Sequence, residues 1–323
     1  MTVLIRATRA LLLLLALGAA QPAYAVDTLT IGTVGSASAN LWPVYIGSTK
    51  GFFAAEGLKV DIVFVQSSAN MIQQLSAGSL DITMSTGLVD PIRAIDQGAP
   101  IAIVRFEAQA PPYALLAKPN IKTLSDLEGK LISLGGAKDI TRIYVERMLA
   151  PHGVKAGEFD MMFAGATAAR SSALLAGAVD AAILLAPFIF QAEASGFNNL
   201  GLTVEYAPEL PFSGTVVNKN WAVKNEPILK RLLAAHAKSV EWFYDDRNRD
   251  DAIQMMVTAS RQKLEDVQKS YDLIRKNNFF DRSGTVSRRK MTALIDALQT
   301  LGDVQAQGNI ERFVMPNITQ ISD

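Results

Sequence analysis

Residues Leu75–Ile82, LSAGSLDI, recur later in the chain as Leu174–Ala181, LLAGAVDA. Each copy places a glycine, Gly78 or Gly177, directly after a helical stretch, where a helix C-terminus favours positive φ. An aspartate then opens a strand in both copies. We interpret the repeat as one α/β unit used twice, which predicts two similar lobes, although so short a match can also arise by chance. Two copies are too few for a solenoid.

The flanking sequence alternates strand and helix patterns. β-branched apolar runs predict strands, and apolar residues at helical spacing between them predict helices. This alternation implies mainly parallel sheets with helices on their faces, an α/β fold. We expect strands at 28–34, 60–65, 81–84, 101–106, 113–117, 131–134, 159–163 and 181–185, and helices at 43–50, 69–77, 140–150 and 168–176.

From Asn225 onward the pattern becomes helical. Apolar residues from Leu229 to Phe243 share one helix face behind a cap at Asn225, and His236 on this stripe is better explained as a core histidine than as a ligand. Further helices are expected at 260–276 and 287–301, with no strands between them. We expect this layer to return to the first lobe. One lobe would then hold residues 26–110 and 215–323, and the other residues 111–214.

Residues 1–25 have the pattern of a secretory signal peptide. Arg6 and Arg9 precede the apolar run Ala10–Ala20, and Ala23-Tyr24-Ala25 supplies a cleavage site. The run is too short to span a bilayer, and without a polar face it is a poor candidate for a buried helix. We therefore predict cleavage after Ala25 and export, to the periplasm in a bacterium with two membranes.

The composition excludes several classes of protein. The 323 residues include 31 Lys+Arg, 31 Asp+Glu, two His and no Cys, and 49% are hydrophobic. Balanced charge argues against nucleic acid as a partner, and the lack of Cys excludes disulfides, thiolate metal sites and a Cys nucleophile. The length corresponds to about two domains.

Catalytic and nucleotide-binding motifs are missing from the sequence. We find no Gly-x-Ser-x-Gly elbow, no phosphate-binding loop and no Gly-x-Gly-x-x-Gly. The segment 287–290 matches Ser-x-x-Lys without its companion motifs, so Ser287 is interpreted as a helix cap. We predict a protein that is not an enzyme and holds no metal or cofactor.

Polar loops follow the expected strands of the first lobe, at the edge where parallel sheets bind ligands. Each loop leads into a helix N-terminus, whose unpaired N–H groups suit an anion or a carbonyl. Ordinary capping is the competing interpretation for each serine, and core packing for the tryptophan. The candidate ligand-binding residues here are Ser38, Asn40, Leu41, Trp42, Ser67, Ser68, Thr86 and Gly87.

The second lobe repeats this arrangement. Gly135-Gly136 permits close backbone approach, and Arg142 near the next helix start could clamp a carboxylate or sulfonate unless it is a surface arginine. Arg170 is a second, weaker candidate. The candidate ligand-binding residues here are Lys138, Asp139, Arg142, Thr167, Pro187 and Phe188.

Four sequence blocks occur in the order typical of a known family. They are residues 51–60 (GFFAAEGLKV), 75–82, 124–130 (LSDLEGK) and 174–181, with Pro187 shortly after. Together they resemble the type II periplasmic solute-binding proteins of ABC importers. The nearest branch contains the binders of nitrate, sulfonate, taurine and thiamine-pyrimidine precursors. The resemblance spans about Thr28 to Gly201.

The resemblance implies a two-lobed fold with the ligand in a cleft between the lobes. Segments near 107–112 and 208–214 would join the lobes, which close on the solute and dock on an inner-membrane permease. Ala186 stands where family members often carry an acidic residue, which disfavours cationic ligands. Arg142 favours a small organic anion, a carboxylate or sulfonate, aromatic ones included. The expected partners are this solute and the permease, and we expect a monomer.

Three alternatives stay open at this level. The ligand could be a pyrimidine precursor or nitrate, as in other members of the family. Biosynthetic enzymes share the fold, although the pyrimidine-synthesis enzymes carry a cysteine-rich motif that this chain lacks. The protein could also pass its ligand to a sensor kinase or another carrier.

Overall fold

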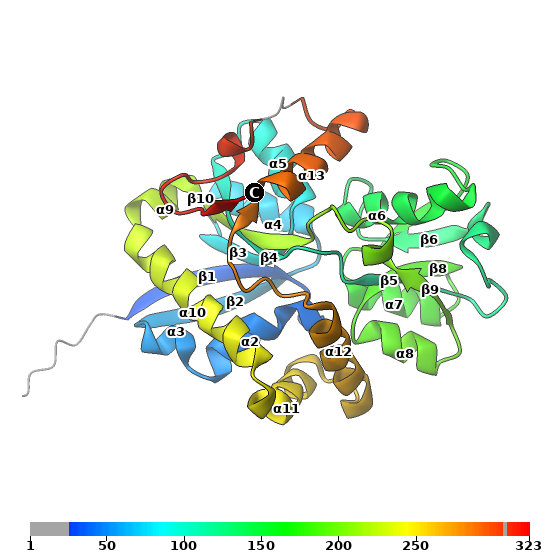
Figure 1. Ribbon diagram of the computed structural model, residues 1–323, viewed down its shortest axis with the longest axis horizontal. Coiled ribbons are helices and arrows are strands. Elements are labelled where there is room, and N and C mark those ends of the chain that lie inside the picture. Colours follow the sequence, from blue (N-terminus) through cyan, green and yellow to red (C-terminus); the bar gives the residue numbers. More distant parts are fainter. Residues whose placement is uncertain (1–25, 306–308) are drawn as a thin grey trace, which may run out of the picture.

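The computed structural model of the protein describes residues 26–305 and 309–323, so the predicted signal peptide lies outside the described residues. The described chain forms two lobes side by side, each built on one five-stranded sheet flanked by helices (Figure 1). Within these residues no helix is both long and apolar enough to cross a bilayer.

The sheet of the first lobe has the strand order β2-β1-β3-β10-β4. Strand β1 pairs in parallel with β2 and β3, whereas β10 runs antiparallel to β3 and β4. A short parallel pair, β11 and β12, lies apart from this sheet. The strands are β1 (Asp27–Val34), β2 (Leu58–Val65), β3 (Ile82–Gly87), β4 (Ile101–Ala108), β10 (Ser213–Asn218), β11 (Val286–Ser287) and β12 (Ile321–Ser322).

The sheet of the second lobe follows the same plan, with the order β7-β6-β8-β5-β9. Here β6 pairs in parallel with β7 and β8, and β5 runs antiparallel to β8 and β9. In each lobe the antiparallel strand, β10 or β5, is the first strand after the chain arrives from the other lobe. The strands are β5 (Tyr113–Ala117), β6 (Leu131–Leu134), β7 (Asp160–Phe163), β8 (Ala181–Leu185) and β9 (Asn198–Leu202).

The sequence repeat occupies equivalent positions in the two lobes. Gly78 and Gly177, at the ends of equivalent helices, have φ values of 77° and 74°. Asp81 accepts a hydrogen bond from the backbone N–H of Thr30 in β1, and Asp180 accepts one from Leu131 in β6. The two sheets therefore have the similarity that the repeat predicts.

Helices cover both sheets. In the first lobe α10 packs on α2 and α3, and α4 lies against β1 and β3. In the second lobe α7 and α8 lie against β8. The helices are α2 (Trp42–Thr49), α3 (Phe52–Ala55), α4 (Ser68–Ala77), α5 (Val89–Asp96), α6 (Ile140–Leu149), α7 (Thr167–Leu175), α8 (Phe188–Ala194), α9 (Lys219–Lys224), α10 (Glu226–Tyr244), α11 (Arg249–Ser260), α12 (Leu264–Asn277) and α13 (Arg288–Thr300).

The expected elements omit the strands β9 and β10 and the helices α5, α8 and α9, and the C-terminal third differs as well. The expectation of three helices without strands is wrong, because α11 precedes α12 and β11 precedes α13. Ser287 caps α13 as predicted, by accepting a hydrogen bond from the N–H of Lys290. Asn225 does not cap α10 with its side chain, which instead donates to the carbonyl of Trp221.

Helix α12 contacts both lobes. One apolar cluster joins Trp42 and Phe243 of the first lobe, Phe188 of the second lobe and Tyr271 of α12, and α12 lies against α8 (Figure 1). The C-terminal layer therefore does more than return to the first lobe. It also supports the second lobe from below the junction.

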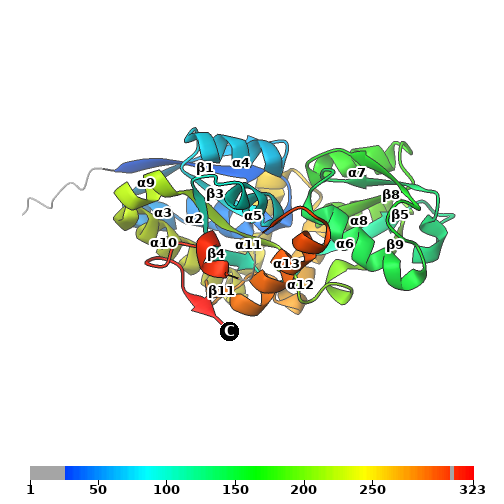
Figure 2. The ribbon, with the colours of Figure 1, turned by 90° about the horizontal axis from the view of Figure 1, so that it is seen from above.

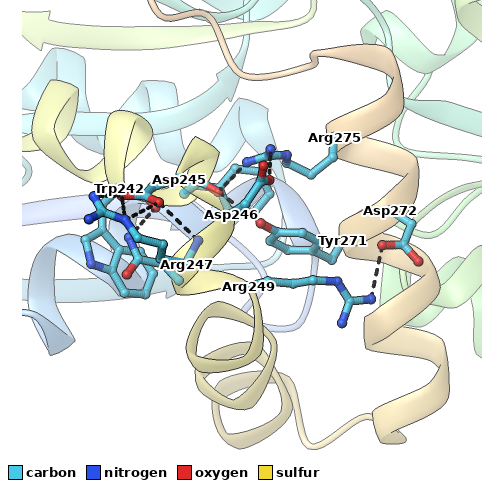
Figure 3. A network of polar contacts seen from close by, with 10 residues as sticks. Trp242, Asp245, Asp246, Arg247, Arg249, Tyr271, Asp272 and Arg275 are labelled. Carbon is cyan, nitrogen blue, oxygen red and sulfur yellow. Dashed lines mark hydrogen bonds and ion pairs between the residues drawn. The ribbon is translucent and has the colours of Figure 1, made fainter.

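A polar network fixes α12 to its neighbours. Arg275 of α12 forms an ion pair with Asp246 and lies over the ring of Tyr271, while Arg249 of α11 pairs with Asp272 at 3.2 Å (Figure 3). Most of these side chains are partly exposed, so each pair adds little stability by itself. Together they connect α12 to α11 and to the segment between α10 and α11.

Candidate ligand-binding cleft

A cavity of about 60 Å³ lies between the lobes, at the carboxyl ends of the strands. The first lobe contributes the loops after β1, β2 and β3, and the second lobe those after β6 and β7. Tyr113 and Phe212, which flank the two crossings between the lobes, close the cavity on the hinge side. The cavity is thus built from both lobes.

The wall from the first lobe carries uncharged polar groups. Ser67 caps α4 through a hydrogen bond from the N–H of Asn70, and Ser85 lines the cavity in a left-handed conformation with φ 53°. The side-chain oxygen of Asn40 is buried without a hydrogen-bond partner. This wall offers hydroxyl and amide groups but no cation.

The wall from the second lobe carries a buried cation, Arg170. Its side chain is on α7 and only 3% exposed, Nη2 donates to Thr167 Oγ1 at 2.7 Å, and the guanidinium lies 5.5 Å from the centre of the Tyr113 ring. The Nε of Arg170 is buried without a partner. Because an unused buried donor costs free energy, a ligand oxygen that accepts from this guanidinium would be strongly favoured.

Helix α7 begins at the cavity without a side-chain cap. Its N-cap residue is Ala166, which cannot accept a hydrogen bond through its side chain, whereas Ser67 caps α4 and Asp139 caps α6. The N-terminal N–H groups of α7 therefore lack the side-chain partner that the other two helices have. Such a helix start, with its positive dipole end, suits an anion.

Gly135 makes room for two charged side chains. A Cβ atom at this position would lie 2.7 Å from Asp139 Oδ1 and 3.0 Å from Arg170 Nη1. Asp139 is occupied with Thr141, whose N–H and hydroxyl donate to the carboxylate at 2.9 and 2.6 Å. The carboxylate thus serves the start of α6 and leaves Arg170 without an ion-pair contact within the described chain.

The opposite edge of the cleft, near α6, is rich in carboxylates. Burial, and next the charge of Asp139, raise the pKa of Asp90 in α5 to about 6. Arg93 of α5 forms an ion pair with Asp303 and donates to the carbonyl of Lys138, which ties the loop before α6 to the first lobe. The cations at this edge, Arg93, Lys138 and Arg142, are thus each paired with a carboxylate, whereas Arg170 beside α7 has no ion-pair partner among the described residues.

A smaller apolar cavity of about 20 Å³ adjoins the main one. The two cavities share Asn40, Leu185 and Phe212, and Ile274 of α12 and Phe280 close the far end. The cleft therefore combines a polar compartment beside Arg170 with a small apolar one beside α12.

Part of the predicted site lines the main cavity. These residues are Ser38, Asn40, Ser67, Ser68, Gly87, Asp139 and Thr167. The predicted N-termini of α4, α6 and α7 do meet at this cavity. Each of these helices follows a strand whose carboxyl end faces the space between the lobes.

Other predicted residues lie outside the cavity. Trp42 is fully buried in the core, where its indole N–H donates to the carbonyl of Ala252 at 2.7 Å, and Thr86 bonds Thr83 at 2.8 Å. An indole of this size packs between α10, α11 and α12 rather than facing solvent. The predicted residues in this group are Leu41, Trp42, Thr86, Pro187 and Phe188.

Lys138 and Arg142 also lie away from the main cavity, at the outer edge of the cleft. Arg142 Nε pairs with Glu146 at 2.7 Å, and its Nη1 donates to the carbonyl of Ala137 at 3.2 Å. Lys138 is 71% exposed and lies 3.5 Å from Asp303. The guanidinium at the cavity is that of Arg170, the weaker candidate from the sequence.

Ser85 and Glu107 are not among the predicted site residues, although Ser85 begins one of the predicted polar loops. Glu107 is buried at the end of β4 and accepts from the N–H and hydroxyl of Ser85 at 2.9 and 3.1 Å, and from Thr215 of β10 at 2.5 Å. This carboxylate therefore ties a cavity residue to both strands that lead to the crossings. In the sequence Glu107 stands two residues after Arg105 in an otherwise apolar strand, and its partners on β3 and β10 lie far away along the chain.

This cluster lacks the geometry of a hydrolytic triad. His236 Nε2 lies 3.8 Å from Glu107 Oε2, the oxygen that accepts from Ser85, and both ring nitrogens lack hydrogen-bond partners. Burial lowers the pKa of His236 well below its usual value. A hydrolytic triad needs a histidine hydrogen-bonded to the serine, and His236 makes no such bond to Ser85.

Comparison with known proteins defines the family. The family model described as NMT1/THI5 like matches residues 38–249, more than half of the chain, so the chain belongs to this family. A formylaminopyrimidine-binding protein of Halalkalibacterium halodurans is 24% identical over 224 residues, which cover 67% of this chain and 65% of the relative.

Solved structures show the fold of periplasmic binding proteins. The alkanesulfonate-binding protein of Xanthomonas axonopodis pv. citri bound to MOPS has a TM-score of 0.74 at 16% identity, covering 94% of this chain and 100% of that one. The nitrate-binding protein of Synechocystis PCC 6803 has a TM-score of 0.72 at 15% identity, with coverages of 87% and 83%. A desulfurization enzyme shares the fold with a TM-score of 0.66 at 12% identity and coverages of 90% and 97%.

Proposed function

We propose that this protein is the solute-binding component of an ABC importer and that it holds a small organic anion between its lobes. The observation that carries the proposal is Arg170, a buried guanidinium with an unused donor at the uncapped start of α7. Anions are the ligands that such a pair of groups stabilises. Its family and its fold support the transport role.

The size of the cleft favours an aliphatic anion. An apolar cavity that holds benzene has a volume of about 150 Å³, whereas the main cavity here has about 60 Å³ and the apolar one about 20 Å³. A sulfonate or carboxylate beside Arg170 with a short alkyl group toward Phe280 fits both compartments. An aromatic ligand would require the lobes to stand further apart.

A pyrimidine precursor is the second candidate, because the curated relative binds formylaminopyrimidine. Such a ligand is uncharged, so the Nε of Arg170 would have to donate its hydrogen bond to a carbonyl oxygen of the ligand. Nitrate is a third ligand of the same family, and it would fill the polar compartment but not the apolar one.

The ligand class is tested by mass spectrometry of solute copurified with the protein, followed by calorimetry on ligand-stripped, refolded protein. The titrants are methanesulfonate, butanesulfonate, butyrate, benzoate, nitrate and formylaminopyrimidine. We expect the aliphatic anions to bind most tightly. Tighter binding of formylaminopyrimidine would reassign the ligand, and binding of none of them by folded protein would overturn the proposed receptor function.

Export and delivery to a permease belong to the same proposal. Cleavage after Ala25 is tested by N-terminal sequencing of the protein from a periplasmic fraction. Full-length protein confined to the cytosol would contradict the transport role and favour a biosynthetic activity on this fold.

A further inference from the structure

Backbone atoms of the two lobes meet at more than one place: the N–H of Ala39 donates to the carbonyl of Ala186 at 2.8 Å, and a closer approach without a hydrogen bond occurs at Gly165. Gly165 follows β7 in the second lobe and Gln66 follows β2 in the first, and these two residues face each other directly. The two loops then enter α7 and α4, which lie on the same side of the molecule, one on each lobe (Figure 2). The contact at Gly165 therefore lies beside the two helix starts that line the cavity.

Only glycine fits at this contact. A Cβ atom on Gly165 would lie 2.5 Å from the carbonyl oxygen of Gln66, and a backbone atom cannot move aside as a flexible side chain does. Gly165 also has φ 69°, and its N–H donates to the carbonyl of Gly135 at 3.0 Å, which fixes its position. The neighbouring contact of Gly35 with Ala166 is looser, since a Cβ on Gly35 would stand 3.4 Å away.

We propose that Gly165 is the positioning residue that lets the lobes close to the separation seen here, and that it thereby determines the size of ligand the cleft accepts. A side chain at this position holds the loop before α7 away from the loop before α4. Arg170 and the N-terminus of α7 would then be displaced from the serines of the first lobe. This inference rests on the proposed function, because closure matters only if the cleft binds a ligand.

The expected loss of affinity follows from the population of the closed state. If only the closed form binds, the apparent affinity falls in proportion to the population of that form. Gly165→Ala should therefore weaken binding by about tenfold or more, whereas Gly35→Ala should have a smaller effect. Gly153→Ala is the matched control, because Gly153 has φ 85° with nothing within 4 Å of an added Cβ.

Closure is measured without reference to the ligand. The chain has no Cys, so Gln73→Cys on α4 and Ala176→Cys after α7, both exposed, accept a unique pair of spin labels. Sucrose favours the state with less exposed surface and so drives closure without any ligand. With sucrose, the Gly153→Ala protein should gain the short interlobe distance of the native protein, and the Gly165→Ala protein should not.

The outcomes separate this inference from the proposed function. If the Gly165→Ala and Gly153→Ala proteins show the same distance distributions in sucrose, the role of Gly165 is overturned, whatever the protein binds. Thermal unfolding of both variants checks that each is folded and carries a similar backbone strain. Titration with butanesulfonate then tests the ligand: no binding by the native protein counts against the proposed function while the distances still decide the role of Gly165.

Discussion

Helices α6 and α7 of the second lobe begin in the same way and end up in different chemical settings. Each follows one of two paired parallel strands, β6 or β7, and each carries an arginine in its first turns, Arg142 or Arg170. Arg142 pairs with Glu146, one turn further along its own helix, and lies at the outer edge of the cleft. Arg170 has Leu174 at the equivalent place and is buried beside the cavity.

The difference teaches that the neighbours of an arginine decide whether it is available to a ligand. Around α6, Glu146 pairs with Arg142, and Asp303 pairs with Arg93 and Lys138, so the positive charges there are already satisfied. At α7 the N-cap is Ala166 and no carboxylate makes an ion pair with Arg170 within the described chain. A ligand anion completes the second setting and competes in the first.

Replacing the arginine of α7 should have the largest effect on binding. Arg170→Met removes the charge while keeping a buried side chain of similar length, and affinity for an aliphatic sulfonate should fall by about 1.5 to 3 kcal/mol, the value of hydrogen bonds to a charged group. Calorimetry measures this loss. The free energy of unfolding without ligand should stay unchanged or rise, because a buried charge without an ion pair is replaced by an apolar group. An equal affinity in the variant would place the ligand elsewhere.

The carboxylates near α6 predict a pH dependence of stability. The pKa of Asp90 is raised from 3.8 to about 6 on folding, so the folded state resists its ionisation. The free energy of unfolding therefore falls as pH rises from 3.8 to about 6, and it stays at this lower value above pH 6. Asp90→Asn should therefore raise the free energy of unfolding by about 2 to 3 kcal/mol at pH 7.5 and have little effect at pH 3.5.

Chemical denaturation at both pH values measures the effect of Asp90→Asn. The exposed carboxylate of Asp160 supplies the control variant Asp160→Asn, which should be neutral at both pH values. A stabilisation by Asp90→Asn that does not change with pH would show that lost ionisation is not its cause.

A cap on α7 should make that helix resemble α6. Ala166→Ser supplies a hydroxyl that accepts from the N–H groups of the first turn, which should stabilise the protein by about 1 kcal/mol. The same hydroxyl competes with the ligand for those donors, so affinity should fall severalfold. Denaturation and calorimetry report the two effects. Ala169→Ser, one turn into the helix and exposed, is the control, and equal behaviour of the two variants would contradict a ligand at the uncapped N-terminus.

Local sequence predicted which loops and helix N-termini form the cleft, but not which arginine lines it. Strand ends and helix starts follow from short-range patterns, so Ser67, Asp139 and Thr167 were expected at the cleft. Which of two arginines faces the cavity depends on a partner one turn away and on packing across the lobes. The pair Arg142 and Glu146 has the spacing of a helical ion pair, and this signal was present in the sequence.

Contacts between distant segments could not be predicted. Trp42 follows a polar loop and resembles a ligand platform, yet its environment is set by α10, α11 and α12, far along the chain. Glu107 likewise shares an otherwise apolar strand with Arg105, and its hydrogen-bond partners Ser85 and Thr215 come from β3 and β10. Such burial depends on tertiary packing that a single sequence does not display.

The smallest expected effect is that of Arg142→Ala, and it tests the comparison most directly. The loss of the pair with Glu146 should cost about 0.3 to 0.5 kcal/mol of stability, as for other helical pairs one turn apart. Affinity for the tightest-binding anion should change by no more than about 0.5 kcal/mol, because Arg142 is already neutralised and lies away from the main cavity. In the double variant with Arg170→Met the two effects should add, since no contact links the two arginines. A large loss from Arg142→Ala alone would mean that closure on ligand breaks the pair with Glu146 and turns Arg142 inward, and the two helix starts would then share the anion.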